Sequence, residues 1–157
     1  MTEWAEHFEE TAPPATEDAI ASARERVGSA LPDDLASFYR ATNGGVPKRR
    51  FVVGDHPDAE TMLSYFLSLD GGPFPNALDY ASELLSEGAI PSGMLPVAED
   101  FGGAFVMVDC NQETFGSVYL MDPTVEPHED GSETFTNMVP VAETFAKLVE
   151  GLGESSD

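Results

Sequence analysis

Hydrophobic residues recur at helical spacing near the start of the chain. Thr16 is followed by two acidic residues and then by an apolar stripe that consists of Ile20, Ala23 and Val27. A threonine side chain caps free N–H groups at a helix start, and acids in the first turn suit the helix dipole. The pattern therefore predicts a helix through about Val27, which Gly28 closes with a positive φ.

A second helix is predicted over residues 33–41. Pro32 suits a helix start because the first N–H groups of a helix have no helical partner, and Asn43-Gly44-Gly45 ends the helix with residues that tolerate a positive φ. One face of this helix is apolar and carries Leu35, Phe38 and Tyr39. Two helices joined by a short turn are expected to form a helical hairpin.

Apolar runs in the rest of the chain predict strands. The clearest are residues 104–108 and 117–121, whose nearly continuous apolar residues indicate sheet interior covered on both faces, and the segment between them supplies a hairpin turn. A further strand is predicted over residues 51–53, and residues 62–69 form another strand or a buried segment. Short extended pieces are expected near residues 94–98 and 134–137. Asn76 predicts the start of a third helix. A final helix is expected to carry Val141, Phe145, Leu148, Val149 and Leu152.

Helices at both ends of the chain, around a group of hairpin-connected strands, indicate an α+β fold. The sheet is expected to be mostly antiparallel and flanked by helices. We predict an acidic N-terminal arm over residues 1–15, a single domain over residues 16–152 and a disordered tail over residues 153–157. Within the arm, Trp4 and Phe8 lie four residues apart, so a short docking helix and a loosely held arm both remain open.

The charge of the chain is strongly negative. It has 29 Asp and Glu residues against 7 Lys and Arg, a formal net charge of −22. This charge opposes binding to a nucleic acid or an anionic membrane, whereas a basic protein partner would be attracted. Adaptation of the whole surface to the host is an alternative explanation, and both can hold. The single Cys110, the acidic start and the lack of a membrane-length apolar run predict a cytoplasmic protein.

Patterns typical of catalysis or metal binding are not found. His7, His56 and His128 are scattered without metal-ligand spacing, and Cys110 has no neighbouring histidine. Phosphate-binding glycine loops and nucleophile-elbow motifs are absent. We therefore predict no metal, no cofactor and no enzymatic activity.

Residues 99–103 form an informative turn. Glu99 and Asp100 are adjacent on an extended run, so their side chains point in opposite directions and do not share one substrate. We expect Asp100 to accept hydrogen bonds from backbone N–H groups of the glycine-rich turn that follows. Phe101 and Phe115 lie in loops beside glycines, where an aromatic ring either projects toward a partner or folds back onto the core.

In order and spacing, several motifs resemble the SUKH superfamily, also called the SMI1/KNR4 family. The first is Leu31-Pro32-x-Asp34-Leu35-x-x-Phe38-Tyr39 followed by Asn43-Gly44-Gly45. The second is Pro96-Val97-Ala98-Glu99-Asp100-x-Gly102-Gly103, which leads into residues 105–109 and 116–119. The third is Pro140-Val141-Ala142-Glu143-Thr144-Phe145-x-x-Leu148. Together these motifs cover roughly residues 16–150.

The resemblance implies a non-enzymatic domain that binds proteins. Many bacterial members look like immunity proteins that neutralise a cognate toxin, often a nuclease, and eukaryotic relatives act as scaffolds or regulators in cell-wall signalling. We therefore expect an immunity-type protein that binds a basic toxin domain. A housekeeping or regulatory adaptor, whose acidity reflects its host, is the alternative. The predicted interface comprises Glu99, Asp100, Phe101, Asp109, Glu113 and Phe115.

Overall fold

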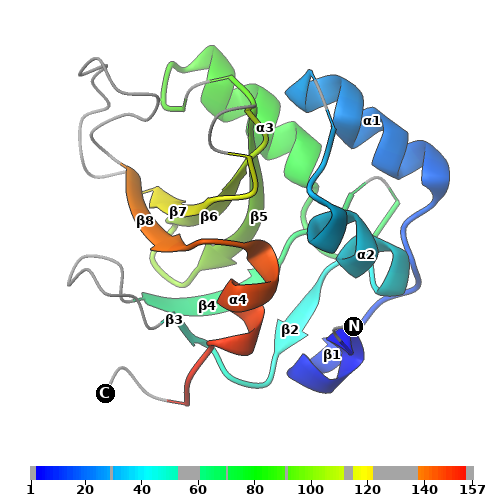
Figure 1. Cartoon of the computed structure of the whole chain (residues 1–157), viewed down its shortest axis with the longest axis vertical. Coiled ribbons are helices and arrows are strands. Elements are labelled where there is room, and N and C mark those ends of the chain that lie inside the picture. Colours follow the sequence, from blue (N-terminus) through cyan, green and yellow to red (C-terminus); the bar gives the residue numbers. More distant parts are fainter. Residues whose placement is uncertain are drawn as a thin grey trace.

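The fold is built around an antiparallel sheet (Figure 1). The computed structural model describes residues 3–28, 30–52, 61–69, 71–90, 92–111, 115–121 and 138–154. In this part of the chain, eight strands run in the order β1-β2-β4-β5-β6-β7-β8, with β3 also paired to β4. The strands are β1 Phe8–Thr11, β2 Gly45–Pro47, β3 Phe51–Val52, β4 Thr61–Phe66, β5 Met94–Asp100, β6 Phe105–Asp109, β7 Val118–Met121 and β8 Met138–Ala142. The helices are the 3-10 helix η1 Trp4–His7, α1 Glu17–Val27, α2 Asp33–Ala41, α3 Ala77–Ser86 and α4 Phe145–Glu150. All pairings between these strands are antiparallel, so the predicted α+β class is confirmed.

Strand β6 lies inside the sheet, between β5 and β7. Val106 of β6 pairs with Ala98 of β5 on one side and with Leu120 of β7 on the other. All five residues of β6 are buried, so both faces of this strand are covered, as its continuous apolar run predicts. The strands predicted over residues 104–108 and 117–121 are confirmed.

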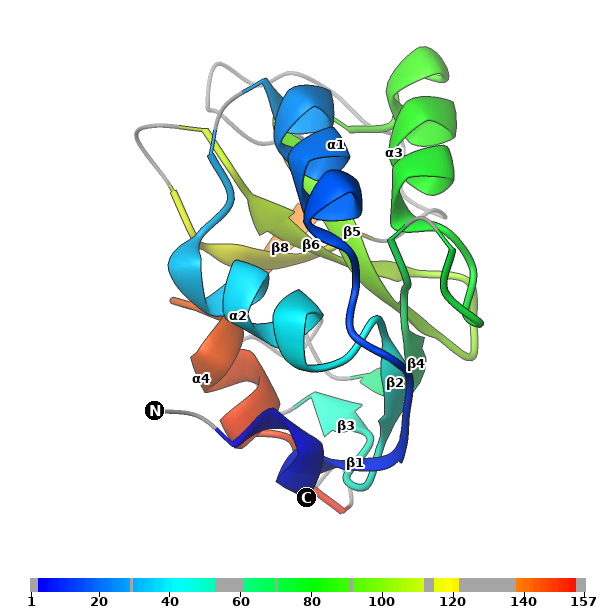
Figure 2. The ribbon, with the colours of Figure 1, turned by 90° about the vertical axis from the view of Figure 1, so that its right-hand side faces the viewer.

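The first two helices form where local signals place them. The Thr16 hydroxyl accepts a hydrogen bond from the Ala19 N–H at 3.0 Å, and Gly28 ends α1 with φ 79°. Helix α3 begins in the same way, because the Asn76 side chain accepts from backbone N–H groups of its first turn. Figure 2 shows α1 and α3 side by side on one face of the sheet, while α2 packs against α4 lower in the view.

A cluster of aromatic rings fills the core where α2, α4 and the N-terminal segment meet. Phe38 lies at its centre, and the ring centroids of Trp4, Phe8, Phe66 and Phe145 lie 5.1–5.8 Å from that of Phe38. Tilted and edge-to-face pairs of this kind add to the stabilisation from burial. Trp4 and Phe8 are both buried, which agrees with the docking helix, one of the two alternatives that we left open for this segment. Here η1 covers the core and β1 extends the sheet.

The C-terminal part departs from the single helix that we predicted. Val141 belongs to β8, which pairs with β7 at the edge of the sheet, and α4 begins only at Phe145. Pairing of β8 with β7 explains the difference, since Pro140 suits a helix start as well as an edge strand and does not decide between them. The Thr144 side chain then caps α4 by accepting a hydrogen bond from the Lys147 N–H at 3.1 Å.

The start of the predicted disordered tail is also held in place. Gly153 and Phe51 exchange backbone hydrogen bonds of 2.9 and 3.0 Å, which corrects the prediction at this residue. The short strands β1 and β2 were not predicted. The turn at residues 55–58, the acidic loop 122–133, the strand at 134–137 and residues 155–157 lie outside the described residues.

Candidate interaction surface

The turn between β5 and β6 is built around the carboxylate of Asp100. Its Oδ1 accepts hydrogen bonds from the N–H of Gly102 at 2.9 Å and of Ala104 at 2.7 Å, and its Oδ2 accepts one from the Thr61 hydroxyl at 2.5 Å. Gly103 completes the turn at φ 92°, in the left-handed region that glycine enters without strain. The expected structural role of Asp100 is confirmed by these bonds.

Phe101 projects from this turn into solvent. Phe101 is 63% exposed, and the neighbouring Met62 is 39% exposed. The Phe101 N–H donates to the Met62 carbonyl at 3.2 Å, and the Arg50 guanidinium carbon lies 5.9 Å from the centroid of the Phe101 ring. This distance is within reach of a cation–π contact. Arg50 is itself anchored by Glu9 at 3.0 Å. We call Phe101, Met62 and Arg50 the apolar patch.

Glu99 points away from the apolar patch, toward two tyrosines. Tyr65 pairs with Glu99 across strands β4 and β5, and its hydroxyl donates to Glu99 Oε1 at 2.9 Å. Partial burial and then the Glu99 carboxylate raise the pKa of Tyr65 to about 12. The same two causes raise the pKa of Tyr80 on α3. Glu99 is therefore a half-buried acceptor for aromatic hydroxyls.

The other predicted interface residues lie at the far end of β6. Strand β6 spans five residues, so its ends are separated by roughly 13 Å at about 3.3 Å per residue. At the far end, Phe115 is 45% exposed, but Asp109 is fully buried, and its Oδ1 accepts a hydrogen bond from the Asn111 N–H at 2.8 Å. The expectation that Asp109 is an exposed interface acid is therefore wrong, because its carboxylate serves the turn after β6. Glu113 lies outside the described residues.

The structure thus brings Glu99, Asp100 and Phe101 together and places Phe115 elsewhere. Sequence reasoning missed Arg50, Met62, Tyr65 and Tyr80. Arg50 carried a signal, since it belongs to the only basic cluster, Lys48-Arg49-Arg50. The other three residues had no signal, because strand pairing and helix packing alone bring them to this surface.

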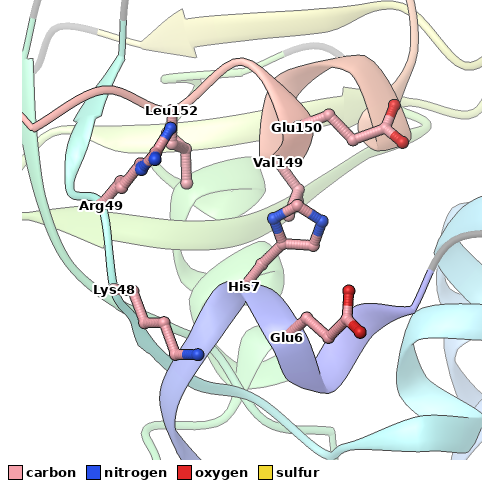
Figure 3. Close-up of a pocket in the computed structure, with 7 residues that line it drawn as sticks. All are labelled: Glu6, His7, Lys48, Arg49, Val149, Glu150 and Leu152. Carbon is pink, nitrogen blue, oxygen red and sulfur yellow. The ribbon is translucent and has the colours of Figure 1, made fainter.

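A second feature is a hollow of about 310 Å³ between η1, the end of β2 and α4. Figure 3 shows Lys48 and Arg49 on one side of it, Glu6 and Glu150 on the other, and His7 between them. The Lys48 N–H donates to the His7 carbonyl at 2.9 Å, which ties η1 to the end of β2. The hollow therefore depends on the docked N-terminal segment.

Other chemistry finds little support in the described part of the chain. No group of three or more His, Cys, Asp or Glu residues there is arranged to hold a metal ion. Cys110 is buried, and burial followed by the nearby Asp109 raises the pKa of its thiol to about 12, so the reactive thiolate is disfavoured. None of the helices in these residue ranges has the length and apolar character that a membrane span requires.

In the described part of the chain, an antiparallel sheet is flanked by helices and carries an exposed aromatic residue on a braced turn, so the class is an α+β domain. The sequence model of the SMI1 / KNR4 family (SUKH-1) matches residues 14–151, so the chain belongs to this family. The family resemblance drawn from the sequence motifs is thereby confirmed. No curated protein matches the chain.

Proposed function

We propose that this protein is an immunity-type domain that binds a basic toxin domain and blocks it without catalysing a reaction. Family membership supports a role in protein interaction, because SUKH domains are typically protein-interacting immunity or regulatory domains. The proposed contact surface is the apolar patch around Phe101, together with Glu99 and Asp100, the two acids that precede Phe101 at the end of β5.

The exposure of Phe101 is the observation that carries this proposal. A phenylalanine that is 63% exposed lies on a turn braced by three hydrogen bonds to Asp100. A rigid aromatic anchor loses little conformational entropy when it binds, and such residues are typical of interface hot spots. Scattered exposed apolar residues are ordinary, but here Met62 and Phe101 are adjacent and held by backbone contact.

Net charge supplies the second part of the argument. At −22, the chain attracts basic proteins over long range and repels nucleic acids. A nuclease presents a basic surface to its substrate, so an acidic protein complements that surface. The complex is expected to form more slowly at high salt, since steering between exposed charges is screened.

Co-expression with a candidate toxin domain tests the proposal. Survival of the cells and co-purification of the two proteins are expected. Phe101→Ala should lower affinity by about 2 kcal/mol or more, the range of hot-spot residues. Leu85→Ala is the matched control, because Leu85 is 43% exposed on α3 and should bind as the parent does. Phe115→Ala reports on the other end of β6.

Two outcomes would contradict this proposal. Equal affinities for Phe101→Ala and Leu85→Ala would remove the apolar patch from the interface. Failure to protect against any neighbouring toxin domain, combined with stable co-purification of a housekeeping protein, would favour a regulatory adaptor whose acidity reflects its host.

A further inference from the structure

The hollow beneath η1 has opposite charges on facing walls. Lys48 and Arg49 follow β2 on one side, while Glu6 of η1 and Glu150 at the end of α4 lie on the other (Figure 3). Its base is apolar, because it is formed by Val149 and Leu152. These two residues are buried, with exposed fractions of 2% and 4%. Three separate parts of the chain therefore contribute a cationic wall, an anionic wall and an apolar base.

The cationic side chains of the hollow do not form ion pairs with its anionic side chains in the described structure. Among the described residues, no nitrogen of Lys48 or Arg49 comes within the 4.0 Å ion-pair distance of the Glu6 or Glu150 carboxylate. Within the described residue ranges, the ion pair of Arg49 is a long contact of 3.9 Å with Glu154, in which both side chains are more than half exposed. The hollow keeps the two walls apart, so each wall is available to a ligand group of the opposite charge.

We propose that this hollow binds a small zwitterion with an apolar body, such as a free amino acid or a dipeptide. The carboxylate would lie against Lys48 and Arg49, the ammonium group against Glu6 and Glu150, and the apolar body over Val149. The volume of the hollow, about 310 Å³, is at the lower limit of the roughly 300–1,000 Å³ typical of small-molecule sites. It therefore suits a ligand as small as an amino acid or a dipeptide. The proposal goes beyond the proposed function and does not depend on it.

A simple anion or cation fits the hollow less well. An anion would meet Glu6 and Glu150 as well as the net charge of −22, whereas a cation would meet Lys48 and Arg49. Only a molecule with both charges uses both walls. Because the four charged side chains are solvent-exposed, each ion pair is expected to contribute a factor of about two to five in affinity. Binding in the millimolar range is expected.

The test is an NMR titration of the full chain with three ligands that share one side chain. L-leucine carries both charges, N-acetylleucine only the negative one, and leucinamide only the positive one. We expect saturable shifts of the Val149 and Leu152 methyl groups and the His7 ring with leucine, and at least threefold weaker binding of each blocked form. A parallel titration with alanyl-leucine distinguishes a dipeptide site from an amino-acid site.

Matched variants complete the test. Lys48→Gln and Glu150→Gln should each weaken leucine binding about two- to fivefold. Lys147→Gln and Glu143→Gln are the controls, because these two residues pair with each other at 2.7 Å on the exposed surface, outside the hollow. Equal affinities for the three leucine forms, the absence of a saturable shift, or equal effects of the four variants would overturn the proposal.

Discussion

Removal of the Asp100 carboxylate tests whether the β5–β6 turn is held as described. Asp100→Ala deletes three hydrogen bonds, from Gly102, Ala104 and Thr61. Each bond contributes about 1 kcal/mol, the typical net value for a hydrogen bond in a protein. The Ala104 N–H also loses its acceptor at a buried position. The expected loss in free energy of unfolding is therefore about 3 kcal/mol.

Urea denaturation, followed by circular dichroism, measures this loss. With an m-value of about 2 kcal/mol/M, the unfolding midpoint should fall by roughly 1.5 M. Asp100→Asn keeps an acceptor oxygen for both N–H groups and should lose only about 1 kcal/mol. Asp18→Ala is the control, because this acid is exposed in the first turn of α1 and its loss should cost less than about 1 kcal/mol. A loss for Asp100→Ala no larger than that for Asp18→Ala would refute the structural role of Asp100.

Three further predictions concern the core and its titratable groups. Trp4→Ala should lower the free energy of unfolding by about 3–5 kcal/mol, measured by thermal unfolding, because the indole is buried against Phe38; a loss below about 1 kcal/mol would mean that the N-terminal segment is not part of the core. The Cys110 thiol should react with Ellman's reagent only after denaturation, because it is buried and its pKa is raised to about 12; rapid reaction of the native protein would contradict this. The pKa of Tyr65 is raised from 10.0 to about 12. The stability that its neutral phenol contributes is therefore complete below pH 10 and is lost as the pH rises toward 12. Glu99→Gln should lower the pKa of Tyr65 in an absorbance titration, and an unchanged pKa would show that Glu99 has no influence on it.

Local signals predicted the helices and the central strands because those elements depend on residues close in sequence. Thr16, Asn76 and Gly28 act on their own helix ends. The β6 strand was evident because a continuous apolar run must be buried on both faces. The prediction failed at Val141, where apolar spacing suits both a helix and a strand, and pairing with β7 decides for the strand.

The candidate surface was only partly predictable. Asp100 was assigned correctly, since an aspartate before a glycine-rich turn binds the backbone locally. Asp109 was not, because its burial depends on strands and turns distant in sequence. Tyr65 and Tyr80 meet Glu99 only after β4 has paired with β5 and α3 has packed on β5.

The sequence by itself determined the fold class, the ends of the first three α-helices, the buried strand β6, the family and the acidic character of the chain, because each follows from composition or from local motifs. The tertiary structure decided which side chains share a surface. It separated Phe101 from Phe115 by the length of β6, buried Asp109, and docked η1 against β2 and α4 to form the charged hollow. Contacts between distant residues depend on packing of the whole chain, and no local pattern encodes them.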